Sequence, residues 1–121
     1  DMPILTESIN IKMLSPLVLK MYDEKTDKDQ YQDASSEDFQ KSFVEVTEKQ
    51  LKNMGLNIST EGLSIEAINS KRTVVSEFET KFAASIGTYM LHGNPELLNI
   101  LYGAGIGHKR NAGFGLFSVV A

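Results

Sequence analysis

The residues best suited to chemistry lie together near the C-terminus, in the stretch GAGIGHKRNAGFGLFSVV. Five glycines surround His108, Lys109, Arg110 and Asn111 in this stretch. Glycine allows positive φ and close backbone approach, and a run of free main-chain amides at such a turn binds anions, phosphate above all. Lysine adds a flexible point charge and arginine a bidentate fork. The stretch therefore predicts a phosphate or RNA site. Glycines that serve only packing, with solvated cations between them, fit the same pattern.

Known phosphate-binding motifs do not account for this loop. It lacks the ordered Gly-Lys-Ser/Thr ending of a Walker loop, and the residues after it predict a strand rather than a helix. The dinucleotide-binding fingerprint also requires a following helix. If the loop binds phosphate, it does so in another structural context.

Candidates for catalysis or metal binding are few. His108 with Lys109 is the only pair suited to general acid–base work, and neighbouring cations should keep that histidine neutral. We favour an RNA-contacting or exposed role for His108 and a structural or exposed role for His92. Two distant histidines and no cysteine give no metal site, and the acidic segment lacks the glycine and final glutamate of a calcium loop. We therefore assign no catalytic residue, no metal and no cofactor.

Composition bounds the protein to one domain of 121 residues, with 41% apolar and 23% charged residues and no cysteine. A net charge of -4 argues mildly against nucleic acid as a partner. The charge is uneven, however. Residues 23–38 are strongly acidic, whereas residues 97–121 contain no Asp or Glu. Tyr22 and Tyr31 lie beside the acidic segment, and we do not expect them to stack on bases.

The sequence shows no pattern typical of a membrane protein. No apolar run approaches the ~18 residues that cross a bilayer, and no signal peptide is visible, so we expect a cytoplasmic protein without a membrane partner. The chain starts at Asp1 rather than methionine. That start fits a piece of a longer chain.

The pattern of apolar residues predicts six elements. Residues 8–21 alternate as a strand with a bulge or edge position at Pro16, and residues 23–38 follow as a solvated loop. A helix capped by Ser36 ends at Gly55. Residues 63–92 predict two long strands that turn near residues 77–80, and a second helix begins with the cap Asn94. A final strand covers residues 114–120. The order β-α-β-β-α-β predicts an α+β ferredoxin-like domain over residues 1–121, with a four-stranded antiparallel sheet and two helices on one face.

The glycine-rich stretch closely resembles the C-terminal signature of the CRISPR-associated endoribonucleases that cut repeat RNA into guide RNAs, within the RAMP superfamily. KMLSPLVL resembles the leading strand of that family, and GNPELLNILYGAGIG its second helix. His108 stands where the family often has an acidic or polar residue. The matching positions are Gly105, Ile106, Gly107, Lys109, Arg110, Gly113, Phe114 and Gly115.

The resemblance implies the C-terminal half of a chain about twice this length, whose N-terminal half carries the catalytic histidine. The whole protein would cut RNA without metal, by attack of a 2′-hydroxyl, and this half alone would be inactive. The implied partners are CRISPR repeat RNA, the N-terminal half, and other effector subunits or a second copy. The implied RNA-binding residues are Gly105, Gly107, His108, Lys109, Arg110, Asn111, Gly113 and Gly115.

Two other functions fit the same residues. One is a non-catalytic RAMP subunit of a CRISPR effector complex that holds guide RNA. The other is a ferredoxin-like regulatory module whose glycine loop binds a small molecule or a protein.

Overall fold

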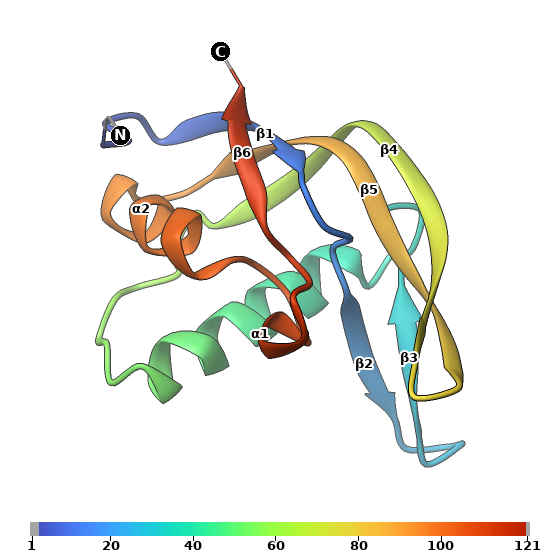
Figure 1. Cartoon of the computed structure of the whole chain (residues 1–121). Coiled ribbons are helices and arrows are strands. Elements are labelled where there is room, and N and C mark those ends of the chain that lie inside the picture. The colour runs from blue at the N-terminus through green and yellow to red at the C-terminus, as the bar shows by residue number, and fades with distance from the viewer. Residues whose placement is uncertain (1–2, 121) are drawn as a thin grey trace.

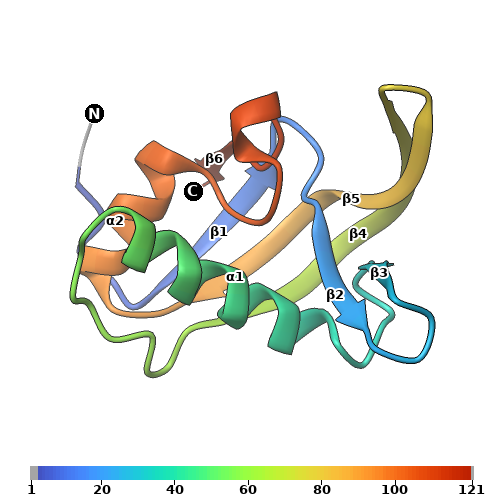
Figure 2. The same cartoon turned by 90° about the horizontal axis from the view of Figure 1, so that it is seen from below.

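The computed structural model of the chain describes residues 3–120 and has the predicted ferredoxin-like architecture. A four-stranded antiparallel sheet in the order β4-β5-β1-β6 carries both helices on one face (Figures 1 and 2). A two-stranded sheet, β2-β3, lies beside it. The elements are β1 (Ser8–Met13), β2 (Leu19–Asp23), β3 (Lys28–Gln32), α1 (Phe39–Asn53), β4 (Ser64–Glu77), β5 (Thr80–His92), α2 (Pro95–Ala104), the 3-10 turn η1 (Arg110–Ala112) and β6 (Phe117–Val120).

The first predicted strand is divided in two. β1 lies at the centre of the main sheet and alternates exposed and buried residues, as its sequence predicts. The chain then leaves the sheet around Pro16, and Leu17 bridges to Ser85 of β5 instead. Because proline has no amide hydrogen to donate to a sheet ladder, the strand breaks there. The prediction of one strand over residues 8–21 was wrong.

The acidic segment is also more ordered than predicted. Its residues Lys28–Gln32 form β3, which pairs with β2 in a hairpin. Lys20 and Asp29 stabilise the pair across the strands with an ion pair of 3.1 Å. The expectation of a solvated loop therefore fails for these residues, because all five pair with β2 across the hairpin.

Helix α1 begins later than predicted. Its cap residue is Asp38, which makes no side-chain cap hydrogen bond. Ser36, the predicted cap, lies in a preceding turn where its Oγ accepts from the amide of Asp38 at 3.2 Å. The predicted end is confirmed, since Gly55 has φ +72° immediately after the helix. Helix α2 begins as predicted, with the side chain of Asn94 accepting from the amide of Glu96.

Strands β4 and β5 extend beyond the sheet as a long arm (Figure 1). A register shift between Ala67 and Asn69 bends the arm. There Gly87, with φ +104°, faces the carbonyl of Asn69 so closely that a Cβ would lie 2.1 Å from it. The arm ends in the predicted turn, at Phe78 and Glu79, both of which have positive φ.

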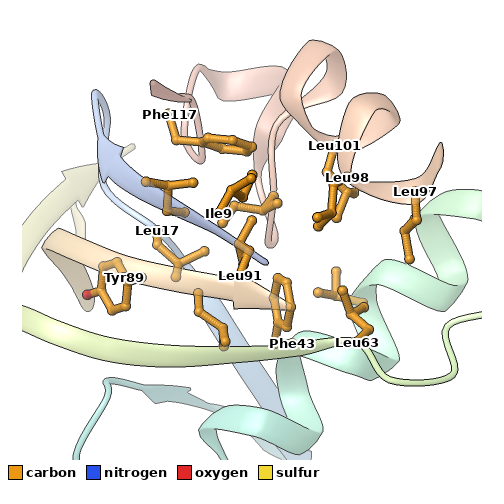
Figure 3. Close-up of a cluster of buried hydrophobic side chains, with 14 of the residues drawn as sticks. Ile9, Leu17, Phe43, Leu63, Tyr89, Leu91, Leu97, Leu98, Leu101 and Phe117 are labelled. Carbon is orange, nitrogen blue, oxygen red and sulfur yellow. The ribbon is translucent and has the colours of Figure 1, made fainter. Parts of the chain in front are cut away.

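The main core lies between the sheet and the two helices (Figure 3). Tyr89 is fully buried in this core. A smaller cluster of Val18, Phe82 and Ala84 lies under the arm, so Phe82 is a core residue too. The side chains labelled in Figure 3 are Ile9, Leu17, Phe43, Leu63, Tyr89, Leu91, Leu97, Leu98, Leu101 and Phe117.

Candidate functional site

The glycine loop connects α2 to β6 and needs its glycines for close packing. A Cβ at Gly107 would lie 2.6 Å from the carbonyl oxygen of Val18, and one at Gly115 would lie 1.9 Å from that of Ile106. Both residues also have positive φ, where side chains are strained. The loop backbone therefore packs closely against the segment that leads into β2, at Gly107, and the residue before β6, Gly115, packs closely against Ile106.

Most of the loop amides are already bonded within the protein. The amide of His108 donates to Val18 at 2.7 Å, and that of Gly115 donates to Pro16 at 2.9 Å. The expectation of a cradle of free main-chain amides is therefore wrong for most of the loop, because acceptors within the loop itself and in the segment before β2 occupy the donors. The bonded amides are those of Gly105, Ile106, His108, Ala112, Gly113, Phe114, Gly115 and Leu116.

Side chains of the loop nevertheless line an open groove of about 730 Å³. Its other walls come from the β2-β3 hairpin and from one face of α1. Four cationic side chains line it against two carboxylates, although the protein as a whole has a net charge of -4. A groove with an excess of positive charge concentrates anionic ligands. The cations are Lys20, Lys49, Lys109 and Arg110, and the carboxylates are Asp29 and Glu45.

His108 attaches the loop to the free edge of β2. Its amide donates to Val18, and its Nδ1 accepts from the amide of Lys20 at 3.3 Å. The imidazole thereby takes the place of a carbonyl in a sheet ladder, and this fixes the proton of the neutral ring on Nε2. Burial, and then the positive charge of Lys20, lower the pKa of His108 to about 4. The expected neutral histidine is confirmed, but burial rather than the adjacent Lys109 is its main cause.

Lys109 lines the groove, but its ammonium group points to the arm. Its Nζ lies 2.8 Å from the Glu77 carboxylate and 5.3 Å from the centre of the Phe82 ring. The hydrogen bond to Glu77 raises the pKa of Lys109. The backbone at Lys109 is left-handed, with φ +60°. This lysine therefore ties the glycine loop to the end of the arm.

Arg110 and Lys49 differ from the other cations of the groove, since neither makes an ion pair within residues 3–120. The Nε of Arg110 donates to the carbonyl of Gly107 at 3.1 Å, which fixes the base of the guanidinium. The other N–H donors of the guanidinium remain available to a ligand. Asn111 is exposed at the rim. These side chains can bind the oxygens of an anion that enters the groove.

Sequence reasoning missed the groove residues that lie outside the glycine loop, among them Lys20, Tyr22 and Lys49. Lys49 follows the buried Val46 by three residues, so its position beside the buried stripe of α1 could be predicted from the sequence. The contact of this side of α1 with the glycine loop could not be predicted, because the two segments lie far apart in the chain. His92 is a structural residue at the end of β5, with its Nδ1 2.7 Å from the Oγ of Ser8.

The part of the chain that the structure describes contains neither a metal-binding cluster nor a membrane-spanning helix. No group of three His, Asp or Glu side chains lies close enough to hold a metal ion there. No helix within residues 3–120 is long and apolar enough to cross a bilayer.

A family model described as CRISPR associated protein Cas6, C-terminal, matches residues 1–119. Among solved structures, a Cas6-related protein from Pyrococcus furiosus is similar with a TM-score of 0.88 and 22% identity, covering 99% of this chain and 51% of that one. A RAMP protein described as binding different RNA substrates has a TM-score of 0.85 and 21% identity, over 100% and 52% of the two chains. A CRISPR associated protein Cas6 has a TM-score of 0.82 and 18% identity, over 99% and 52%. The chain thus spans about half the length of these solved proteins. No curated protein matches it by sequence.

Proposed function

The chain belongs to the family of Cas6 C-terminal domains, and from this membership we propose that it binds repeat RNA in the groove beside the glycine loop. The observation that carries the proposal is the excess of cations in that groove, with Arg110 and Lys49 free of carboxylate partners within residues 3–120. Phosphate contacts with Lys and Arg dominate the affinity of proteins for RNA and DNA. One of the similar solved proteins, the RAMP protein, is itself described as binding different RNA substrates.

Each predicted loop residue has a part in this proposal. Arg110 and Asn111 contact the RNA directly, and His108 lines the groove while it holds the loop to β2. Lys109 holds the arm in place through Glu77. Gly105, Gly107, Gly113 and Gly115 give the loop the conformation that presents these side chains.

Cleavage is proposed to need a second half of the protein. Attack by a 2′-hydroxyl without metal requires a general base and acid with pKa values near the working pH. His108 has a pKa of about 4, and its Nδ1 is occupied by the amide of Lys20. It is therefore unsuited to that role, and this chain alone should leave RNA intact. The same observation is expected of the second candidate, a non-catalytic RAMP subunit that only holds RNA.

The proposal predicts RNA binding that weakens steeply with salt and depends on the groove. Replacement of both Lys49 and Arg110 by alanine should remove two phosphate contacts. On a single strand each contact contributes about 0.7 to the slope of log affinity against log salt, so the slope should fall by about 1.4. Fluorescence anisotropy with labelled repeat RNA over a salt series measures this.

A matched control removes the same charge elsewhere on the same helix. Lys41 and Lys52 lie on α1, are exposed, and do not line the groove. The double variant Lys41→Ala/Lys52→Ala should keep the slope of the unaltered protein. Equal slopes in the two double variants would contradict RNA binding in the groove. A flat salt response in the unaltered protein and in both variants would favour the regulatory module instead.

A further inference from the structure

Resting on the proposed function, we propose that the groove takes an unpaired nucleotide, whose base stacks on the ring of Tyr22. Tyr22 lines the groove on β2, two residues after Lys20, so both side chains lie on the same face of the strand. It is 58% exposed, unusually open for a large aromatic residue beside a cationic groove. No aromatic ring within residues 3–120 pairs with it.

The Tyr22 ring is held in place without being covered. Its hydroxyl donates to the carboxylate of Asp27 in the hairpin turn, and its backbone pairs with Asp29 across the hairpin. Because only its hydroxyl is held, the ring keeps a fixed conformation while its faces stay exposed. Base stacking on such a ring costs little side-chain entropy and contributes about 1–3 kcal/mol per base.

The charges around Tyr22 favour a base at this place over a phosphate. Asp27 accepts from the Tyr22 hydroxyl and makes no ion pair within residues 3–120, so its charge repels phosphate at the ring, whereas Lys49 and Arg110 attract phosphate elsewhere in the same groove. The neighbouring acids were the reason not to expect stacking from the sequence. They oppose a phosphate contact, however, and leave the neutral ring face available.

His108 supplies a neutral donor in the same groove as the Tyr22 ring and the cations. Because its Nδ1 accepts from Lys20, its Nε2 carries the proton, and Nε2 has no partner within residues 3–120. A neutral N–H of this kind donates to a base carbonyl or to a 2′-hydroxyl. Aromatic surface, a neutral donor and unpaired cations together suit a single strand, since the bases of a duplex are stacked on one another and unavailable to the ring.

The inference predicts that Tyr22→Ala lowers the affinity for a single-stranded RNA oligonucleotide about tenfold, with an unchanged salt slope. Tyr22→Phe should stay within about threefold, because it keeps the ring and loses only the hydroxyl. Tyr102→Ala is the control, since Tyr102 is a partly exposed tyrosine of α2 outside the groove. The same oligonucleotide in a fully paired duplex should bind more weakly than the single strand.

A spectroscopic readout separates stacking from packing. The chain contains no tryptophan, so Tyr22→Trp introduces a single indole whose fluorescence should be quenched when the single strand binds. Unchanged affinity of Tyr22→Ala, or equal affinity for single strand and duplex, would overturn the inference while a normal salt slope leaves the proposed function standing. Loss of salt-dependent binding in every variant would overturn both.

Discussion

Gly115→Ala is expected to lower the free energy of unfolding by at least about 3 kcal/mol. The new Cβ would lie 1.9 Å from the carbonyl oxygen of Ile106, and the residue would keep a φ of +84° that L-residues rarely adopt. Strained backbone of this kind costs about 1–3 kcal/mol by itself. Relief of the clash would also separate Ile106 from Gly115, which are joined by a hydrogen bond of 2.9 Å, and would disturb the fully buried Ile106 side chain. Urea unfolding of both proteins measures the difference.

Gly103→Ala serves as the matched control for this change. Gly103 lies inside α2, and a Cβ there meets nothing within 4 Å. Alanine is the better helix former by about 1 kcal/mol, so this variant should be as stable as the original or more so. If the two variants unfolded at the same urea concentration, the close approach of the loop to Ile106 would not be the reason for the glycine.

His108 should make the stability of the protein depend on pH between about 6.5 and 4. Its pKa is lowered from 6.5 to about 4 in the folded protein, so the unfolded state binds more protons across this range. The contribution of His108 is therefore complete above pH 6.5 and is lost as pH falls toward 4, by about 3 kcal/mol in total. Physically, a protonated Nδ1 no longer accepts the hydrogen bond from the amide of Lys20.

The variant His108→Asn isolates this effect from the titration of carboxylates. Asparagine places an acceptor oxygen where histidine has Nδ1, and it does not take up a proton. Unfolding free energies at pH 7 and pH 4.5 should differ more for the original protein than for His108→Asn. An identical pH dependence of the two proteins would show that the loop does not depend on a neutral imidazole.

The order of elements was predictable because each has a local signal. Alternation in β1, the cap at Asn94 and the glycine after α1 all act within a few residues of where they lie. Where the prediction erred, the cause was also local but ambiguous. Pro16 is compatible with a bulge or an edge, whereas the chain in fact leaves the main sheet there and begins a second one.

The site was less predictable, because its bonds join segments about 90 residues apart. The amide of His108 donates to Val18 and that of Gly115 donates to Pro16, and neither partner is visible from the glycine spacing. The sequence located the loop and the neutral histidine correctly. It left the glycines open between phosphate binding and packing, and the structure shows that at Gly107 and Gly115 they permit backbone contact inside the protein.

The central claim is that RNA lies in the groove between the glycine loop, β2 and α1. The alternative surface is the face of the sheet that the helices leave open, on the upper side in Figure 1, where Asn10, Lys12, Thr88 and Met90 point away from the core. The most direct test is the change in backbone amide NMR signals as single-stranded repeat RNA is added to the protein. We predict that the largest shifts fall on Lys20, Tyr22, Lys49 and Arg110. Shifts concentrated on Asn10, Lys12, Thr88 and Met90, with the groove unchanged, would contradict the claim.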